Sequence, residues 1–464
     1  MKIHRLTWLV IFAVLFTGAC GSPSGDDDDA AGETDDDAAA DDDHSPADDD
    51  DNDDDNDNDD TEPPCDETRT PIVFVHGFLE VGDAFATQAM RFTSNGYCRD
   101  RIFAFDYNTL FGPFGTNESL DALIDAVLAR TGAAKIDLLG HSLGGAVCYQ
   151  YLEPAANAAK VAHYVSLASF PLGEVPNGVP GMNVSSTADT MAGPSTMPGG
   201  ENVSFDDLDH LQVATSEKTF AALYPFFNGG ETPATTEIVP EEIIRIGGRA
   251  VTFAENAPAP NAHIQIFKLD PETGARLTEE PAADLITDRL GYWGAFTAAP
   301  DAFYEFVCLD PSGDWPPVHY YREPFTRSNA MVYFRVFPPK QSLLGLAFRL
   351  LPLNDDYAIF AWLNINQAAV YGRDTFAVNE FDLATPEMTD PSITTITVFF
   401  FDTNFNGVSD GAPAGGIWSS FPFLRAFDLW LPATGSTRFQ FDGREMNIRN
   451  WPSKTDGLSI AVFE

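Results

Sequence analysis

Basic residues, cysteines and long apolar runs are all scarce in this sequence. It holds 26 Lys and Arg against 70 Asp and Glu, a formal net charge of −44 at pH 7. Because phosphate binding needs a basic surface, we expect no nucleic-acid partner. Among the five cysteines there is no CxxC pair and no Cys/His cluster with the spacing of a zinc site.

The one marked apolar run lies at the start of the chain. Lys2 and Arg5 precede the apolar stretch Leu6 to Phe16, which is too short to span a bilayer and has the layout of a secretory signal. The residues before Cys20 resemble a bacterial lipobox, with Thr17 where leucine is usual. We therefore expect a lipoprotein signal peptide over 1–19, a lipidated Cys20, and an outer-membrane, cell-surface or extracellular location. An ordinary signal peptide with a chance cysteine is the alternative.

Acidic residues concentrate in one segment. Between Gly21 and Pro64 there are 20 Asp and 2 Glu and no Lys or Arg. Such a segment cannot bury apolar surface and repels itself, so 20–64 is predicted to be a disordered linker. A calcium-binding tail is the weaker alternative, because flexible carboxylates do not form a fixed cage.

The next part of the chain alternates apolar strands with helical patterns. Pro71 to Val75, Arg101 to Phe105, Ile136 to Leu139 and Val161 to Ala168 read as buried strands, and Glu118 to Arg130 reads as a helix between two of them. This alternation predicts a parallel sheet with helices on both faces, an α/β domain over 65–235.

Helical patterns stop near Ile238 and short alternating runs replace them. Runs such as Ile264 to Phe267 and Phe303 to Val307 are separated by turn signals, which is the pattern of a β-sandwich. We predict C-terminal all-β sandwich or barrel domains, with one module over 236–315 and a second over 316–464.

Two cysteines lie a few residues before strands of the predicted parallel sheet. Cys65 and Cys98 therefore belong to the same edge of the sheet, and the exported context permits a disulfide between them. Cys148 lies one helical turn past Gly144, after the third strand, and is expected to be a buried free thiol.

The stretch Gly140-His141-Ser142-Leu143-Gly144 stands between the third strand and a helical run. A G-x-S-x-G in a strand–turn–helix context predicts a nucleophile elbow, in which glycines allow close approach while the serine adopts a strained conformation. We expect Ser142 to be a catalytic nucleophile; a structural turn serine is the alternative.

A serine hydroxyl needs a neighbouring imidazole to take its proton. His163 precedes the core of its strand, the wrong end for a site at strand ends. His210 lies in a loop before the last helix of the α/β part, predicted over Ser216 to Tyr224. We expect His210 to be the base, with an ordinary surface histidine as the alternative.

A carboxylate must orient that imidazole. Met182 to Asp189 offers a short strand that ends in small residues and an aspartate, so Asp189 is the predicted acid, with Glu174 as a weaker candidate. Three further aspartates lie too near His210 for a separate strand and are expected either in a solvated loop or at a helix N-cap: Asp206, Asp207 and Asp209.

The developing oxyanion needs two backbone N–H donors. One is expected from Leu143, the residue after the nucleophile, and the other from Phe78 in the loop after the first strand. His76 at the start of this loop is expected to stabilise the turn by hydrogen bonding.

These motifs together resemble a known family. V-F-V-H-G-F, G-H-S-L-G-G, S-S-T-A-D and D-H-L-Q occur in the order found in small bacterial lipases of the α/β-hydrolase fold, over about residues 70–230. The resemblance implies the same roles for Ser142, Asp189, His210, Phe78 and Leu143. The layout is also similar to an archaeal lipase with a C-terminal β-barrel domain, and the stretch G-G-R-A-V-T-F resembles a transthyretin-like module.

An aromatic, glycine-interrupted loop follows the second strand. It is expected to form either a small lid or acyl-chain wall, or simply a packed loop. The predicted apolar substrate-binding residues are Leu79, Leu110, Phe111, Phe114 and Phe170, with Leu172 as further lining. An apolar pocket without a charged clamp favours acyl esters or lipids over peptides or phosphorylated substrates.

Oxygen-bearing side chains alternate around a glycine turn in the β-rich part. Asp402, Asn404, Asn406 and Asp410 resemble the first half of a calcium loop, although Pro413 stands where a bidentate Glu belongs. Structural calcium and a plain Asx-rich turn are both open. No cofactor is expected to be required.

The leading hypothesis is an exported, lipid-anchored serine ester hydrolase, a triacylglycerol lipase or carboxylesterase. A non-catalytic surface protein that binds lipid or glycan, with a vestigial hydrolase domain, is the alternative. Hydrolysis of a polymeric ester, with the β-modules docking on the polymer, is a third.

Overall fold

The computed structural model describes residues 65–111, 115–170, 173–310, 312–349, 351–415 and 423–464. The predicted lipid anchor at Cys20 and the acidic linker therefore lie outside the described residues. The described residues belong to one compact unit. No helix in these ranges combines the length and the apolar character that a bilayer crossing requires.

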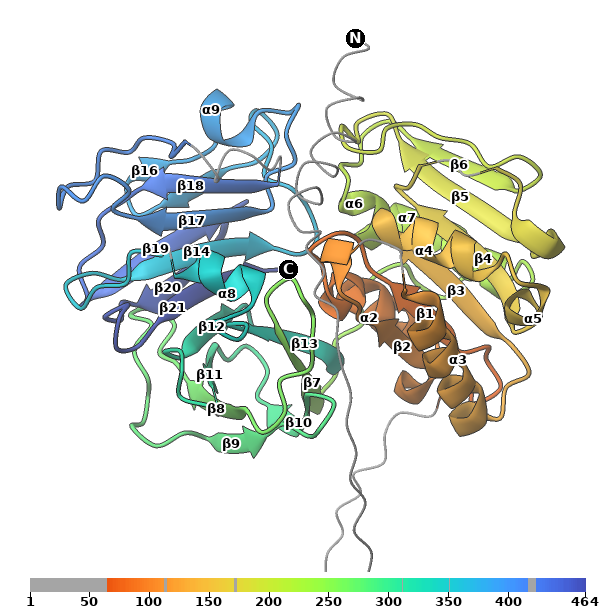
Figure 1. The fold of residues 1–464 in the computed structure, drawn as a ribbon, viewed down its shortest axis with the longest axis horizontal. Helices are drawn as coiled ribbons and strands as arrows, with labels where there is room; N and C mark the ends of the chain where they lie inside the picture. Colours follow the sequence, from red (N-terminus) through yellow and green to blue (C-terminus); the bar gives the residue numbers. More distant parts are fainter. Residues whose placement is uncertain (1–64, 112–114, 171–172, 311, 350, 416–422) are drawn as a thin grey trace, which may run out of the picture. The chain divides into compact units, whose positions relative to one another are not determined.

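The first part of this unit is a six-stranded sheet flanked by helices (Figure 1). All neighbouring strands pair in parallel, in the order β2-β1-β3-β4-β5-β6. The strands are β1 (Ile72–Val75), β2 (Ile102–Phe105), β3 (Ile136–His141), β4 (Val161–Leu167), β5 (Gly181–Ser186) and β6 (Glu201–Phe205). The helices are η1 (Gly82–Phe85), α2 (Ala86–Ser94), η2 (Arg99–Arg101), η3 (Thr109–Phe111), α3 (Asn117–Thr131), α4 (Leu143–Tyr151), α5 (Ala155–Ala158), η4 (Pro176–Gly178), α6 (Gln212–Thr215) and α7 (Glu217–Phe227).

The apolar run of β1 is buried on both faces, as expected for a central parallel strand. Ile72 and Phe74 pack in one core cluster with side chains of α2 and α7. Val73 and Val75 pack in another cluster with side chains of α3 and α4. Helices therefore cover both faces of the sheet, which confirms the predicted α/β fold class.

Strand β6 has no counterpart among the predicted strands. Its residues are mostly exposed, and only Val203 and Phe205 pack against the core. It is an edge strand that pairs with β5 alone. Without a continuous apolar run, such a strand leaves little signal in the sequence.

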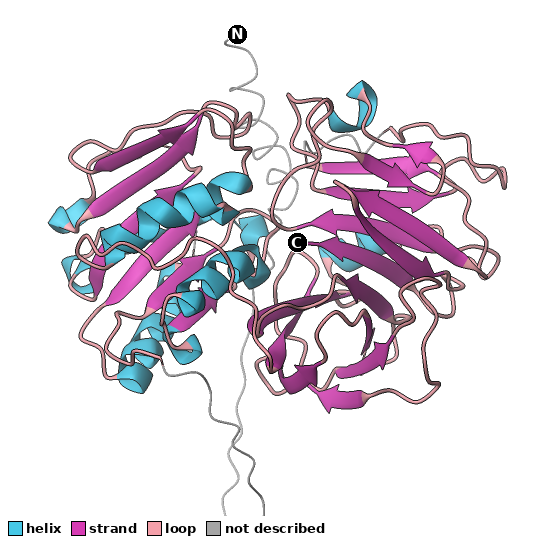
Figure 2. Ribbon diagram, turned by 180° about the vertical axis from the view of Figure 1, so that it is seen from behind, coloured by secondary structure: helices cyan, strands magenta, loops and turns pink. Residues whose placement is uncertain are grey.

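Three sheets make up the rest of the unit, and Figure 2 shows how strands dominate there. Their strand orders are β10-β7-β13, β18-β17-β14-β21-β12-β11-β8-β9 and β16-β15-β19-β20. The strands are β7 (Ile244–Thr252), β8 (His263–Lys268), β9 (Ala283–Ile286), β10 (Tyr292–Ala298), β11 (Tyr304–Leu309), β12 (Val318–Arg322), β13 (Asn329–Val336), β14 (Ile359–Asn364), β15 (Phe376–Val378), β16 (Phe381–Asp382), β17 (Thr397–Phe401), β18 (Leu424–Asp428), β19 (Ser436–Phe441), β20 (Arg444–Arg449) and β21 (Leu458–Phe463). Two short helices, α8 (Leu343–Phe348) and α9 (Pro386–Thr389), interrupt them.

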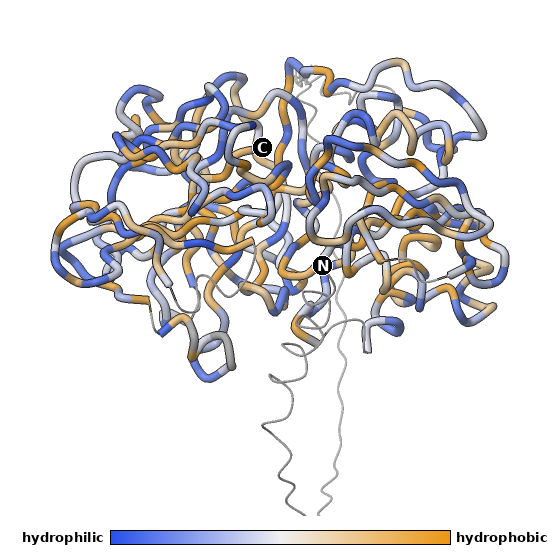
Figure 3. The backbone as a smooth tube through the Cα atoms, turned by 90° about the horizontal axis from the view of Figure 1, so that it is seen from above, coloured by the Kyte–Doolittle hydropathy of each residue, from blue (hydrophilic) through white to orange (hydrophobic). Residues whose placement is uncertain are grey.

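Each small sheet packs on one face of the eight-stranded sheet. One apolar cluster joins it to β7, β10 and β13, and a second joins it to β15, β19 and β20. Apolar stretches run through these strands, while many outer loops are hydrophilic (Figure 3). The predicted β-rich C-terminal part is confirmed, and strands from both sides of residue 316 share the large sheet.

Polar contacts connect the β-rich part to the α/β domain near the ends of β1 and β2. Arg249 Nη1 lies 2.7 Å from Asp106 Oδ2, and Tyr333 donates its hydroxyl hydrogen to the same oxygen. Arg335 Nη2 lies 3.3 Å from Asp83 Oδ1. These strand ends also carry the candidate site.

The predicted disulfide joins Cys65 to Cys98. Both residues precede their strands, at the edge of the sheet where the parallel strands begin. Cys148 is a buried free cysteine, as expected.

Candidate active site

Ser142 occupies the turn between β3 and α4. Its backbone has φ 52° and ψ −119°, a conformation that a non-glycine residue adopts at a cost of about 1–3 kcal/mol. The Ser142 N–H donates to Leu167 O of β4, and its carbonyl accepts from the Gly145 N–H. These bonds hold the strained residue at the carboxyl end of the sheet.

The glycines around Ser142 are required by close backbone packing. A Cβ on Gly144 would lie 2.1 Å from Val75 O, and one on Gly140 would lie 2.4 Å from Gly144 O. A Cβ on Gly145 would meet the Ser169 side chain at 2.6 Å. The start of α4 therefore lies directly on the end of β1, which only glycine permits.

Asp189 and His210 come together from separate loops. Asp189 follows β5, His210 precedes α6, and His210 Nδ1 lies 2.9 Å from Asp189 Oδ2. Both side chains are buried. Asp189 Oδ1 accepts hydrogen bonds from the backbone N–H groups of Met191 and Ala192.

Burial by itself would raise the pKa of Asp189. The charge and hydrogen bond of His210, with the two backbone donors, outweigh burial and hold the pKa of Asp189 below its usual value. Asp189 is therefore ionised at neutral pH and orients the His210 ring. Glu174, the weaker candidate for this role, is exposed.

His141 connects the Ser142 turn to His210. Its Nε2 lies 3.0 Å from His210 O, and the two rings have centroids 4.7 Å apart. Since His141 is the residue before Ser142, the His210 loop is held beside the serine turn.

The other nitrogen of His141, Nδ1, lies 2.9 Å from Glu80 Oε2. Burial would lower the pKa of His141, but the Glu80 carboxylate raises it overall. Burial would likewise raise the pKa of Glu80, but His141 and the Gly77 N–H lower it to about 2. Both ring nitrogens of His141 face acceptors, so the imidazolium is the species that satisfies the geometry.

The loop after β1 lies against Ser142. A Cβ on Gly77 would lie 3.0 Å from Ser142 Cβ, and the Gly77 N–H donates to Glu80 Oε2 at 2.6 Å. This arrangement puts the loop that carries Phe78 beside the first residue of α4, Leu143.

His76 is buried within the same loop. Its Nδ1 donates to Gly77 O, its ring stacks on Tyr107, and the Tyr107 hydroxyl donates to His76 O. Burial lowers the pKa of His76. These contacts are those of a neutral histidine that stabilises the turn.

The predicted substrate-binding residues are partly described. Leu79, in the loop after β1, and Leu110, in η3, are both half-buried, and the Leu79 N–H donates to Thr109 Oγ1 of η3. Phe170 follows β4 and is 66% exposed. Phe111 ends η3; Phe114 and Leu172 lie outside the described residues.

The residues of the predicted calcium loop lie together. The side-chain amides of Asn404 and Asn406 both donate to Asp410 Oδ2, and Asp402 accepts from the N–H groups of Asn406 and Gly407. Among the described residues, no three His, Cys, Asp or Glu side chains are grouped as a metal site would need. Calcium binding stays a prediction, with the Asx-rich turn as its alternative.

Several residues support the site although the sequence predicted no such role for them. Glu80 holds His141, and Asn256, from the turn after β7, donates to Glu80 O at 2.8 Å and to Tyr107 O at 3.0 Å. Asp209 is buried; it accepts from the N–H groups of Leu211 and Gln212 like an N-cap, one of its two expected settings. A Glu three residues after a glycine carries no recognisable signal, and Asn256 reaches the site only through the fold.

Comparison with known proteins agrees with this geometry. Residues 70–200 match the family model described as the alpha/beta hydrolase fold, and residues 242–339 match the lipase C-terminal domain. A further C-terminal domain model matches residues 363–463.

The solved structures to which part of this chain is similar include an esterase and two lipases. An esterase from Rhodococcus sp. ECU1013 has 15% identity and a TM-score of 0.29, covering 36% of this chain and 94% of that one. A Bacillus licheniformis lipase has 16% identity and a TM-score of 0.29, covering 36% and 96%. Aspergillus fumigatus lipase B has 11% identity and a TM-score of 0.30, covering 36% and 54%. The sheet order and these matches together identify residues 70–200 as a domain of the alpha/beta hydrolase fold, followed over 242–339 by a domain that matches the lipase C-terminal model.

Proposed function

We propose that this protein is a serine carboxylic ester hydrolase, a triacylglycerol lipase or carboxylesterase. The observation that carries the proposal is the 2.9 Å contact between the buried side chains of Asp189 and His210, beside the strained turn at Ser142. A nucleophile, a base and an orienting acid on separate strand ends form the set that acyl transfer requires.

In the proposed reaction, Ser142 Oγ attacks the ester carbonyl carbon while its proton passes to His210 Nε2. The Phe78 and Leu143 N–H groups donate to the oxyanion. The bond to the alcohol oxygen then breaks, and His210 gives that oxygen its proton. A water molecule, deprotonated by His210, releases the acid from the acyl-enzyme and regenerates the Ser142 hydroxyl.

The surroundings of Ser142 favour an uncharged acyl substrate. Leu79 follows β1, Leu110 lies in η3, and the exposed Phe170 adds apolar surface after β4. Apolar walls with few polar groups suit an acyl chain. We further propose that this protein is exported and is held to a membrane by a lipid on Cys20, because the stretch before this cysteine resembles a lipobox.

The test is turnover of p-nitrophenyl esters with labelling by a fluorophosphonate probe. Wild-type protein should hydrolyse the ester and carry the probe on Ser142, located by peptide mass spectrometry. Ser142→Ala should lose both, whereas Ser119→Ala, in α3 away from the turn, should lose neither. Absence of turnover and labelling in folded wild-type protein would favour the non-catalytic binding protein.

The anchor is tested separately. Cells expressing the full chain and fed an alkyne fatty acid should yield labelled protein in the membrane fraction, and Cys20→Ser should be unlabelled. Equal labelling of the two would refute lipidation at Cys20.

A further inference from the structure

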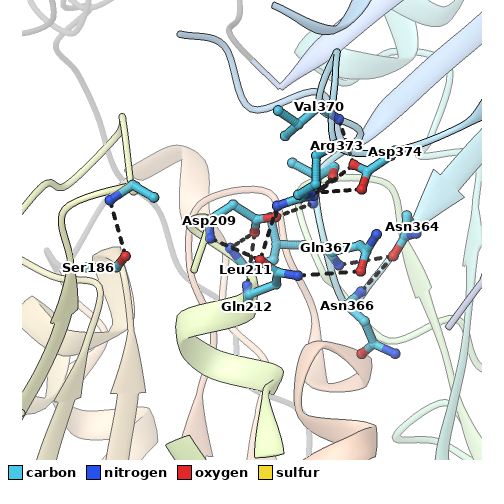
Figure 4. Close-up of polar contacts among 12 residues, drawn as sticks. Ser186, Asp209, Leu211, Gln212, Asn364, Asn366, Gln367, Val370, Arg373 and Asp374 are labelled. Atoms are coloured by element: carbon cyan, nitrogen blue, oxygen red, sulfur yellow. Dashed lines mark hydrogen bonds and ion pairs between the residues drawn. The ribbon is translucent and has the colours of Figure 1, made fainter. Parts of the chain in front are cut away.

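Asp209, the neighbour of His210, divides its carboxylate between two parts of the molecule. Its Oδ1 accepts from the N–H groups of Leu211 and Gln212, both at 3.0 Å. Its Oδ2 accepts from Arg373 Nη1 at 2.8 Å and from the Ala368 N–H at 3.1 Å (Figure 4). One oxygen therefore shapes the His210 loop, and the other ties that loop to the β-rich region.

Asp374 holds the Arg373 guanidinium in place. Its Nε and Nη2 lie 2.8 Å from the two oxygens of Asp374, and Asp374 accepts from the Val370 N–H. A guanidinium fixed on one edge by a bidentate carboxylate presents its remaining N–H groups in a defined direction. Arg373 Nη1 also donates to Gln212 Oε1 at 3.1 Å.

The segment between β14 and β15 packs alongside the His210 loop and α6. Thr215 Oγ1 donates to Asn366 O at 2.6 Å, and Gln212 Nε2 lies 3.4 Å from Gln367 Oε1. Asn364 Oδ1 accepts hydrogen bonds from the backbone N–H groups of Asn366 and Gln367 and thereby shapes this segment (Figure 4). The contact is therefore an extended one, with Arg373 as its charged centre.

His210 is held at three points. Asp189 binds its ring, His141 binds its carbonyl, and the Asp209 carboxylate accepts from the backbone N–H groups of the two residues after it. Burial raises the pKa of Asp209, and the positive charge of Arg373 is the strongest influence that opposes this rise. Loss of the guanidinium would leave a buried carboxylate without its counter-charge, which is strongly unfavourable.

We infer that Arg373, acting through Asp209, is a positioning residue for His210, so that the β-rich region completes the catalytic loop. The inference rests on the proposed function insofar as His210 is the base. It assigns to the C-terminal region a part in catalysis itself, in addition to any contact with substrate.

The control is Arg327, another arginine of the β-rich region that contacts the α/β domain; it is buried, whereas the Arg373 side chain is 32% exposed. Its Nε donates to Thr93 Oγ1 in α2, and its Nη2 lies 3.1 Å from Glu241 Oε1. Arg327 thus resembles Arg373 in pairing with a carboxylate and in joining the two regions, but the contacts described for it include neither the His210 loop nor the Ser142 turn.

Arg373→Gln and Arg327→Gln are compared for kcat, KM and fluorophosphonate labelling rate. Because small displacements of a catalytic group are costly, Arg373→Gln should lower kcat and labelling rate by about tenfold to a hundredfold, with KM nearly unchanged. Arg327→Gln should lower Tm but leave kcat near wild type. Arg373→Lys should recover part of kcat, since lysine keeps the positive charge but lacks the planar, bidentate guanidinium. Equal kcat losses in the two glutamine variants would overturn the inference.

Asp209→Asn provides a second route if Arg373→Gln does not fold. By itself it should reproduce the kcat loss. Where both single variants fold, the double variant should lose less than the product of the single losses, because the two residues act as a pair. A kcat loss in the double variant equal to the product of the two single losses would overturn the pairing.

An NMR readout keeps the inference distinguishable from the proposed function. In protein with ¹⁵N-labelled histidine, the Nδ1–H proton of His210, assigned by its loss in Asp189→Asn, should exchange faster with water in Arg373→Gln and stay as in wild type in Arg327→Gln. That result would support the positioning role even if the wild-type protein hydrolysed no ester. An unchanged proton in folded Arg373→Gln would overturn it.

Discussion

His141 Nδ1 lies 2.9 Å from Glu80 Oε2, so that a buried imidazole and a half-buried carboxylate form an ion pair next to the Ser142 turn. The same carboxylate oxygen accepts the Gly77 N–H, and the opposite nitrogen of His141 faces His210 O. This ion pair thereby joins the loop after β1, the serine turn and the loop of His210.

Glu80→Gln should destabilise the fold by about 3 kcal/mol at neutral pH, because it leaves the buried imidazolium without its counter-charge. The pKa of Glu80 is lowered to about 2 from 4.5, so its stabilising contribution is full above 4.5 and lost as pH falls toward 2. The pKa of His141 is raised above 6.5, so its contribution is full below 6.5 and lost as pH rises past the raised value.

Urea denaturation of wild type and Glu80→Gln between pH 3 and 9 measures this effect. The difference in unfolding free energy should be greatest between about pH 4.5 and 6.5 and shrink on both sides, following the two pKa shifts. A difference that does not vary with pH would contradict the ion pair.

Asp189→Asn should lower kcat by about a thousandfold or more with little change in Tm. The amide can still accept from Met191 and Ala192 but holds the His210 ring in the wrong tautomer. Steady-state hydrolysis of a soluble ester measures the change. Glu174→Gln serves as the control and should keep wild-type kcat; the reverse result would assign the acid to Glu174.

Gly144→Ala should destabilise the protein by several kcal/mol, on the order of the largest single-substitution effects, because the new Cβ meets Val75 O. Gly294→Ala, in β10, adds a Cβ with no atom within 4 Å and has no positive φ, so its effect should be small. Thermal unfolding of both variants gives the comparison. Equal Tm values would show that the turn can relax around a methyl group.

Removing the disulfide by the double change Cys65→Ala and Cys98→Ala should lower stability by about 3–4 kcal/mol, the range expected for a loop of this size. The bond lies at the edge where strands begin, whereas Ser142 lies where β3 ends, so kcat should be unchanged below the new Tm. Calorimetry and ester turnover on the same preparation test both statements. If kcat fell together with the stability, the disulfide would be needed to hold the active site in place.

The local features of the site could be predicted from the sequence. A buried strand, glycines and a helical run around Ser142 are contiguous, and their packing depends on neighbours only a few residues away. The Cys65–Cys98 pairing followed from strand direction, since both residues precede parallel strands. The β-rich C-terminal part was evident from the period-two alternation of its strands.

Only the tertiary structure decided which distant groups support the site. Glu80 and His141 are 61 positions apart, and Asp209 and Arg373 are 164 apart. Such pairs leave no periodicity, because a single charged residue in a loop reads the same whether it is solvated or buried against a partner. Asp209 was one of three similar aspartates in the sequence, and only chain packing, which places Arg373 and Ala368 on its carboxylate, sets it apart.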